Sequence, residues 1–225
     1  MKYHVGFDIN LRKNPYKGKY ITVEGIDGSG KTTQVEEIAN YFRAKGKNVI
    51  QAREPRKTGV IGDIIQKVLN RELKMSEFAF QYLFATDRVL SQEEVIIPAL
   101  KRRDIVISDR CFWSAVVYGI LDRTGGNYDY KEADFLLIVY SILSMYHRFI
   151  VPDYTFYLKT SLDTALLRIR KKDDTKEIYE NRKKLGKVID GYNWLSTKFA
   201  KEIITINAEK SIDEVTKEII SKIKI

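Results

Sequence analysis

The sequence predicts an α/β protein, a three-layer sandwich in which a parallel five-stranded sheet carries helices on both faces. Short β-branched, apolar runs alternate along the 225 residues with longer segments whose apolar residues recur at helical spacing. The chain is 44% hydrophobic and 31% charged, enough for a buried core and a solvated surface. Because alternating strands and helices join by right-handed crossovers, the strands should lie parallel, with helices over both faces of the sheet.

Each expected element has its own signal. The five expected strands are apolar and β-branched: 19–25, 48–52, 104–109, 154–160 and 202–208. The expected helices fill the intervals: 31–45, 59–69, 76–100, one or two within 111–147, one that opens at Ser161, and 211–223. Gly46 should end the first helix, Ser76 should cap the third, and residues 122–129 (DRTGGNYD) should form a turn. The length predicts a single domain, 19–225, preceded by an N-terminal extension, 1–18.

The net charge of +9 is concentrated in two segments. Residues 1–20 carry +4 and residues 168–187 carry +5, so the rest of the chain is neutral. A duplex-binding face would need a broader stripe of charge, so no nucleic-acid partner is expected. The two patches fit a tail and a loop that meets polyphosphate.

Cysteine and histidine are too few for a disulfide or a zinc site. The single cysteine, Cys111, excludes an intrachain disulfide and suits a reducing interior, and there are only two histidines. No apolar run approaches the roughly 18 residues of a membrane span, and the start of the chain lacks the apolar core of a signal peptide. We therefore expect a cytoplasmic protein.

A phosphate-binding loop follows the first strand. Residues 25–32, GIDGSGKT, match G-x-x-x-x-G-K-[ST] at every fixed position and lie between an expected strand and an expected helix. The glycines let successive backbone N–H groups point at phosphate oxygens, and the positive end of the helix faces the same anion. The fold class is therefore a P-loop NTPase-type sandwich. The expected nucleoside triphosphate site is Gly25, Asp27, Gly28, Ser29, Gly30, Lys31, Thr32 and Thr33.

The expected metal is Mg²⁺. Lys31 should reach the outer phosphates, while the Thr32 hydroxyl should ligate the ion. Asp109 ends the strand at 104–109, where an acid can hold Mg²⁺ through water. The alternative is that Asp109 caps the next helix.

Arginines and a ring mark a second pocket. Arg53 and Arg110 each follow a strand, and ligands of open α/β sheets bind outside the carboxyl ends of the strands. A guanidinium there offers a planar fork suited to phosphate. Phe84 and Arg88 are four residues apart on one helix face, where they could stack on a flat base and donate to its exocyclic oxygen. Taken singly, Phe84 could be a core residue and Arg88 a surface residue. Together with the phosphate loop, they indicate a second nucleotide site.

The combined motifs resemble the thymidylate kinase family. The matching runs are EGIDGSGKTTQ, AREP, LFATDR, SDRCFWSAVVYG, VPDYTFYLK, and EIYEN with VIDGYNWLS. They follow the family order from about residue 19 to the C-terminus, roughly nine-tenths of the chain. The resemblance implies transfer of the γ-phosphoryl group of ATP to dTMP, giving dTDP and ADP with Mg²⁺. It also implies a homodimer through long helices such as 76–97, whose apolar positions are Phe78, Phe80, Leu83 and Val89.

The resemblance implies an acceptor site of eight residues. Phe84 would stack on thymine, Arg88 would bond its O4, and Tyr118 would crowd the 2′ side of the sugar. Arg53 and Arg110 would clamp the acceptor phosphate. The full dTMP-binding set is Asp27, Arg53, Phe84, Arg88, Arg110, Ser114, Tyr118 and Tyr192.

The catalytic cations should come partly from a lid at about 168–187. The variable positions of the phosphate loop carry no basic residue. Family members of this kind carry their catalytic arginines on the lid, where a cation can stabilise the transferring phosphoryl. Arg168 and Arg170 are the candidates to stabilise the transferring phosphoryl, the alternative being a solvated basic helix face. The expected catalytic set is Lys31, Asp27, Arg53, Arg110, Arg168 and Arg170.

The chain departs from the family at Cys111, Ala115 and Gly119, which bears on base selectivity, and Ile178 follows the lid acid where the family has arginine.

Two other functions remain open. A deoxynucleoside kinase would use Glu54 as general base for a neutral hydroxyl. A nucleic-acid-stimulated ATPase would use the basic tail and lid.

Overall fold

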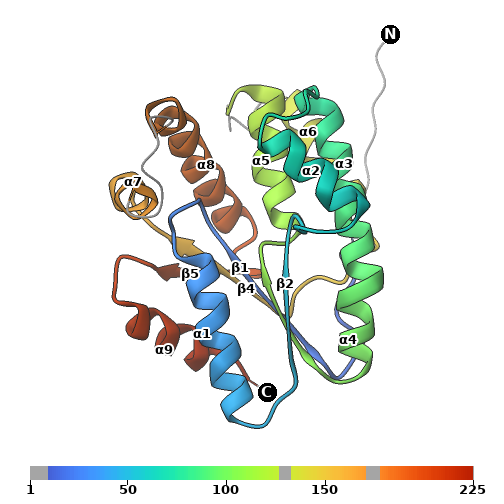
Figure 1. Cartoon of the computed structure of the whole chain (residues 1–225), viewed down its shortest axis with the longest axis vertical. Coiled ribbons are helices and arrows are strands. Elements are labelled where there is room, and N and C mark those ends of the chain that lie inside the picture. Colours follow the sequence, from blue (N-terminus) through green and yellow to red (C-terminus); the bar gives the residue numbers. More distant parts are fainter. Residues whose placement is uncertain (1–9, 127–132, 171–177, 225) are drawn as a thin grey trace.

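The computed structural model describes residues 10–126, 133–170 and 178–224. Its centre is a five-stranded sheet in which every described pairing is parallel, with the strand order β2-β3-β1-β4-β5. The strands are β1 (Lys19–Glu24), β2 (Val49–Arg53), β3 (Ile105–Asp109), β4 (Tyr154–Lys159) and β5 (Ile203–Asn207). The parallel five-stranded α/β sandwich expected from the sequence is confirmed (Figure 1).

Helices connect the strands, as the alternating pattern predicts. They are α1 (Lys31–Ala44), α2 (Val60–Leu69), α3 (Glu77–Ser91), α4 (Ile97–Lys101), α5 (Phe112–Thr124), α6 (Ala133–Ser144), α7 (Leu162–Arg170), α8 (Ile178–Lys198) and α9 (Ile212–Lys222). Ser211 begins α9 with a capping box, in which its hydroxyl accepts from the Glu214 N–H while the Glu214 carboxylate accepts from the Ser211 N–H. Among the described residues, no helix is long and apolar enough to cross a membrane.

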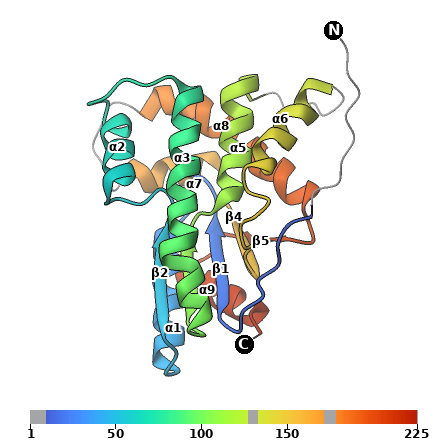
Figure 2. The same ribbon diagram turned by 90° about the vertical axis from the view of Figure 1, so that its right-hand side faces the viewer.

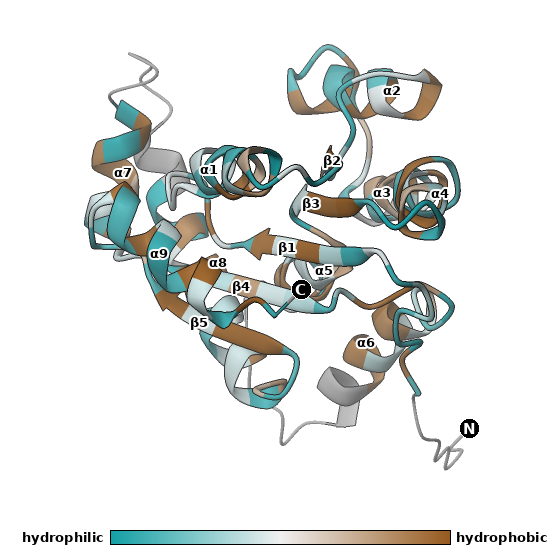
Figure 3. Ribbon diagram, turned by 90° about the horizontal axis from the view of Figure 1, so that it is seen from below, coloured by the Kyte–Doolittle hydropathy of each residue, from teal (hydrophilic) through white to brown (hydrophobic). Residues whose placement is uncertain are grey.

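Two hydrophobic clusters pack on opposite faces of the sheet. Alternate residues of a strand point to opposite faces, so Ile21 and Val23 of β1 face α1 and α9, whereas Tyr20 faces the other cluster. That second cluster takes its side chains mainly from α4, α5, α6 and α8. The central strands are buried on both sides, and on the hydropathy scale of Figure 3 β3 is largely brown while β1 carries brown bands between paler ones.

The helix expected over 76–100 is interrupted. Ser76 caps α3 as expected, its hydroxyl accepting from the Ala79 N–H. A π-helical turn, Gln92–Ile96, then separates α3 from α4, and together they form the long helical column of Figure 2. Gln92, the first residue of this turn, is buried. Its side-chain amide donates to the backbone carbonyl of Ile150 and accepts from the Ile150 N–H. This long-range contact has no signal in the local sequence.

The described part of the segment before β1 lies against the body of the protein. Arg12 forms a parallel bridge with Ile150, and the Asn14 amide donates to the carboxylate of Asp153 at 2.8 Å. Leu11 and Tyr16 pack against the larger hydrophobic cluster. Residues 1–9 lie outside the described residues, so the division into an extension and a kinase domain stays a prediction.

Candidate active site

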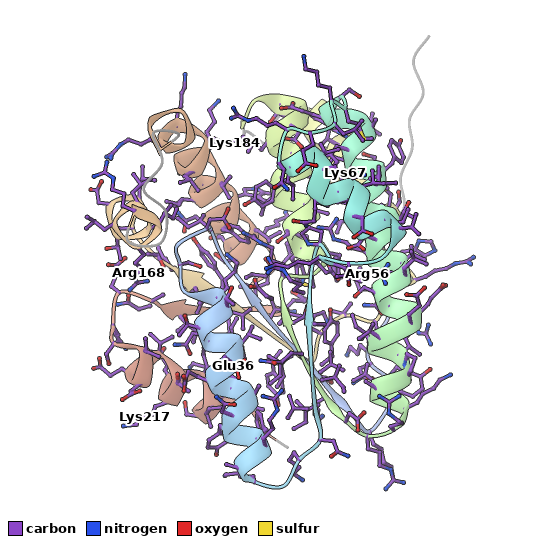
Figure 4. The ribbon with its side chains drawn as sticks, in the orientation of Figure 1. Glu36, Arg56, Lys67, Arg168, Lys184 and Lys217 are labelled. Carbon is purple, nitrogen blue, oxygen red and sulfur yellow. The ribbon has the colours of Figure 1, made fainter. Side chains whose placement is uncertain are left out.

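A cavity of about 410 Å³ lies at the carboxyl ends of β1, β2 and β3, beside the glycine loop. Residues Asp27 to Gln34 line it from the loop and the start of α1, and Arg168 lines it from α7. Figure 4 shows Arg168 on α7, across from α1. The remaining lining residues are Arg53, Asp109, Arg110, Ile169, Ala208, Lys210, Ile212 and Val215.

The glycines of the loop are required by its backbone. Gly25, Gly28 and Gly30 have φ angles of 144°, 79° and 98°, in the region that side chains with a Cβ atom rarely adopt. A Cβ atom on Gly28 would also lie 2.3 Å from the carbonyl oxygen of Ala165 in α7. Glycine at this position therefore lets the loop pack closely against α7.

Lys31 is a buried ammonium group held inside the loop. Its Nζ donates to the Ile26 carbonyl at 2.8 Å and lies 3.6 Å from Asp27 Oδ1. Burial and, second, the nearby Arg110 lower the pKa of Lys31 to about 8, although Asp27, Asp109 and Glu24 oppose the shift. A bound polyphosphate would add negative charge that favours the protonated form.

Thr32 and Asp109 bring a hydroxyl and a carboxylate together at the edge of the cavity. The Thr32 hydroxyl donates to Asp109 Oδ2 at 2.7 Å. Cys111, not Asp109, is the N-cap residue of α5, so the alternative that Asp109 caps this helix is wrong. Hydroxyl and carboxylate oxygens suit Mg²⁺, which usually keeps several waters and takes few protein ligands. The described residues hold no group of three or more His, Cys, Asp or Glu that could bind a metal, so the other ligands would be phosphate oxygens and water.

Arg110 is the centre of a hydrogen-bonded cluster drawn from the glycine loop, α5 and α8. Its φ of 74° lies in the left-handed region that residues with a Cβ atom rarely adopt. Its Nη2 donates to Asp27 Oδ1 at 2.8 Å, and its Nη1 donates to Tyr192 at 2.9 Å and to Ser114 at 3.3 Å. The guanidinium carbon lies 5.5 Å from the centre of the Tyr118 ring. Four residues expected at the acceptor site thus meet around Arg110.

Asp27 is shared between two cations. Desolvation alone would raise its pKa, but Arg110 and Lys31 outweigh this and lower the pKa to about 2. Its carboxylate is therefore ionised, although the side chain is largely exposed.

Arg53 is exposed at the end of β2 and lines the same cavity. The register pairs Arg53 with Asp109 on the neighbouring strand, which places it beside the candidate metal ligand.

Arg88 is buried, so the explanation that it is an ordinary surface residue is wrong. Its Nε donates to Glu54 Oε2 at 2.9 Å and its Nη1 to the Tyr146 hydroxyl at 3.4 Å. The guanidinium carbon lies 5.6 Å from the centre of the Phe84 ring and 5.7 Å from that of Tyr146. Burial raises the pKa of Glu54 to about 7 although Arg88 lowers it. Because this carboxylate is already bonded to Arg88, the geometry does not favour Glu54 as the general base of a nucleoside kinase.

The two lid arginines differ in position. Arg168 donates from Nη1 to the Ser29 carbonyl at 3.4 Å and from Nη2 to the Ala208 carbonyl at 2.9 Å, so it is not part of a merely solvated helix face. Arg170 is exposed and does not line the cavity. Residues 171–177 of the expected lid lie outside the described residues.

Sequence reasoning missed three features of the site. Glu24 ends β1 with a buried carboxylate that accepts hydrogen bonds from α5 and α8. An acid directly before the glycine loop was the available signal for it. Tyr146 gave no signal, because it is 58 residues from its partner Arg88. The segment from Ala208 to Val215 lines one side of the cavity. Its sequence indicates only the end of a strand and the start of a helix, and no binding site was predicted there.

The Asp27 carboxylate contacts both Lys31 of the glycine loop and Arg110 of the arginine cluster. This arrangement is typical of the P-loop nucleotide kinases. The thymidylate kinase family model matches residues 23–219, and the chain belongs to the thymidylate kinase family. A thymidylate kinase of Thermoanaerobacter sp. (strain X514) is 32% identical over 208 residues, which cover 92% of this chain and 98% of that protein. One from Thermosipho africanus (strain TCF52B) is 34% identical over 201 residues, covering 89% and 94%. A probable thymidylate kinase of Pyrococcus horikoshii is 30% identical over 213 residues, covering 92% and 97%.

Proposed function

We propose that this protein transfers the γ-phosphoryl group of ATP to dTMP, giving dTDP and ADP in the presence of Mg²⁺. The observation that carries the proposal is the position of Asp27 Oδ1, 2.8 Å from Arg110 Nη2 and 3.6 Å from Lys31 Nζ. Lys31 belongs to the donor loop and Arg110 to the acceptor cluster. Because Lys31 and Arg110 both lie close to one oxygen of Asp27, they are close enough to each other to bind two neighbouring phosphates, one from the donor and one from the acceptor.

Positioning and charge neutralisation are the main catalytic tasks, since phosphoryl transfer needs little covalent chemistry from the protein. Lys31 and the backbone N–H groups of the glycine loop bind the donor phosphates. The Thr32 and Asp109 oxygens hold Mg²⁺, which when bound neutralises charge on the phosphates. Arg53 and Arg110 bind the acceptor phosphate and hold it in line with the donor.

The acceptor base and sugar meet the second group of residues. Phe84 stacks on thymine, and Arg88, oriented by Glu54 and Tyr146, donates to its O4. Tyr118 lies against Arg110 and limits space at the 2′ position, which favours deoxyribose. Asp27 contacts the sugar and phosphate region of the acceptor, while Ser114 and Tyr192 support Arg110.

Arg168 is the better supported of the two lid candidates for the cation that stabilises the transferring phosphoryl. Its contact with the Ser29 carbonyl places it at the edge of the glycine loop. Arg170 would have to move to reach the same phosphate.

The test is conversion of ATP to ADP with Mg²⁺ over an acceptor panel of dTMP, dUMP, dGMP, AMP, CMP, thymidine and no acceptor. Turnover with dTMP, and weaker turnover with dUMP, is the expected result. Turnover with thymidine but not dTMP would instead identify a nucleoside kinase. Hydrolysis without an acceptor that rises on addition of DNA would identify an ATPase.

We also propose a homodimer formed through α3. Tyr82 and Val89 are exposed on this helix, and their seven-residue spacing places them on one face. Light scattering coupled to size exclusion tests it, since a monomer mass at high protein concentration would contradict the dimer.

A further inference from the structure

The carboxylate of Glu24 lies beneath the arginine cluster and is 1% exposed. Its Oε1 accepts from the Cys111 backbone N–H at 2.8 Å. Its Oε2 accepts from the Ser114 hydroxyl at 2.7 Å and from the Tyr192 hydroxyl at 2.8 Å. Both oxygens are therefore engaged, by donors from the start of α5 and from α8.

The same two hydroxyls are the acceptors for Arg110. Arg110 Nη1 lies 2.9 Å from the Tyr192 oxygen and 3.3 Å from the Ser114 oxygen. A hydroxyl has one hydrogen to donate. Since each hydroxyl directs that hydrogen to Glu24, its lone pairs face the guanidinium.

The charge of Glu24 fixes this arrangement. An ionised carboxylate can only accept, so both hydroxyls must donate to it. The two hydroxyl oxygens are also 2.9 Å apart, and without Glu24 one could donate to the other. The acceptors of Arg110 would then no longer be defined.

We propose that Glu24 is a positioning residue that directs the guanidinium of Arg110 towards the acceptor phosphate, acting through the Ser114 and Tyr192 hydroxyls. Glu24 itself is too buried to touch the acceptor. The inference rests on the proposed function, in which Arg110 binds that phosphate. It also links β1, which leads into the donor loop, to α8, so the two substrate sites share one hydrogen-bonded network.

A purely structural role for Glu24 makes a different prediction. If Glu24 only ties α5 to β1 through the Cys111 N–H, its loss should lower stability without changing which part of the acceptor is bound. A positioning role concerns only the phosphate. The affinity for dTMP should fall, and the affinity for thymidine, which lacks the phosphate, should not.

The informative variant is Glu24→Gln, which keeps the shape but replaces one oxygen by an NH₂ donor. An NH₂ facing the backbone N–H of Cys111 would set donor against donor, and that N–H cannot reverse. The NH₂ group should therefore face Ser114 and Tyr192, which would turn their hydrogens towards Arg110. We expect dTMP to bind roughly tenfold more weakly by titration calorimetry, with thymidine and ATP affinities unchanged.

Asp104→Asn is the matched control. Asp104 is also a buried carboxylate, it pairs with Arg102, and it precedes β3 at the opposite end of the sheet. Its conversion to an amide should leave dTMP and thymidine affinities at the wild-type values even if stability falls.

Tyr192→Phe extends the test should Glu24→Gln not fold. This variant removes one of the two intermediate hydroxyls and should also weaken dTMP selectively. Where both single variants fold, the double variant should lose no more dTMP affinity than the larger single loss, because both changes break one path. Equal weakening of dTMP and thymidine, unchanged dTMP affinity, or additive losses would overturn the role of Glu24. A wild-type protein that binds thymidine as tightly as dTMP would instead overturn the proposed function.

Discussion

At the residue scale, the cations of the site differ in how firmly the protein holds them. The Arg110 side chain has three hydrogen-bond partners, and the Lys31 ammonium is held by a backbone carbonyl and a carboxylate. Arg53 is exposed, and no described side chain forms an ion pair with it. Preorganised groups lose little entropy on binding, whereas Arg53 must be ordered by its ligand. Arg53 is therefore the cation whose removal should disturb the unliganded protein least.

Replacement of Arg53 by alanine should raise the KM for dTMP by at least about tenfold and leave the affinity for ATP unchanged, because a charged phosphate contact is lost on the acceptor side only. Steady-state kinetics with each substrate varied in turn gives both values. Arg102→Ala is the control, since Arg102 is an exposed arginine at the far end of the sheet. Equal loss of ATP and dTMP binding would contradict the assignment.

Replacement of Asp109 by asparagine should weaken the response to Mg²⁺. The amide keeps the size of the side chain but removes the negative charge that faces Thr32, so half-maximal activity should need at least about tenfold more Mg²⁺. Chelation of Mg²⁺ should abolish turnover in the wild type. Asp63→Asn, at an exposed carboxylate of α2, should show the wild-type Mg²⁺ dependence. An unchanged Mg²⁺ requirement in Asp109→Asn would argue against Asp109 as a ligand.

At the element scale, local sequence patterns predicted the backbone features of the helices and loops. They did not predict features that involve contacts between side chains far apart in the sequence. The glycine loop and the Ser76 cap are encoded within a few residues, and both form as expected. The π-helical turn begins at Gln92, whose side chain contacts Ile150, 58 residues away. Arg88 lies between Phe84 and Tyr146, and Tyr146 is likewise 58 residues from Arg88 in the sequence. Periodicity and capping rules contain no information on such contacts.

The packing of α5 against α6 depends on Gly119. A Cβ atom at this position would lie 2.6 Å from Cδ1 of Ile142. Gly119→Ala should therefore destabilise the protein by about 1 kcal/mol, the overpacking cost outweighing the higher helix propensity of alanine. Adding Ile142→Val, which removes Cδ1, should restore most of the loss in urea unfolding.

Gly186 of α8 gives the contrast. A Cβ atom there would meet only Cδ2 of Leu162, at 4.0 Å. Gly186→Ala should stabilise the protein by roughly 0.5–1 kcal/mol, as expected for a helical position with space. If Gly119→Ala were equally stabilising, the Ile142 side chain would move away from position 119 at little cost, and the packing of α5 against α6 would not depend on Gly119.

At the scale of the whole molecule, the carboxyl edge of the sheet concentrates charge in a buried region. Lys31, Glu24, Glu54 and Arg88 are all buried there. Such groups cost stability when they are unpaired and limit the pH range over which the fold is most stable. The site therefore contributes directly to the pH dependence of unfolding.

Glu54 should make wild-type stability rise as pH falls from about 7 to about 4.5. Its pKa is about 7 in the folded protein and 4.5 in the unfolded reference, so the folded state binds more protons in this window. The contribution is fully present below pH 4.5 and is lost as pH rises through 7. Glu54→Gln cannot titrate at this position.

Urea unfolding of both proteins from about pH 8 to about pH 5 gives the comparison, because the other titrating groups largely cancel in the difference. The stability of the wild type relative to Glu54→Gln should increase as pH falls. A difference that is constant with pH, or that shrinks as pH falls, would show that the pKa of Glu54 is not raised.

If the donor and acceptor sites meet across Asp27, the phosphoryl group passes directly between two nucleotides. Phosphorus NMR of a single reaction with ATP, dTMP and Mg²⁺ follows every phosphate at once. For direct transfer, loss of the ATP γ-resonance should be matched, one for one, by the appearance of the β-resonances of dTDP and ADP, with no inorganic phosphate. Growth of inorganic phosphate in place of dTDP would contradict it.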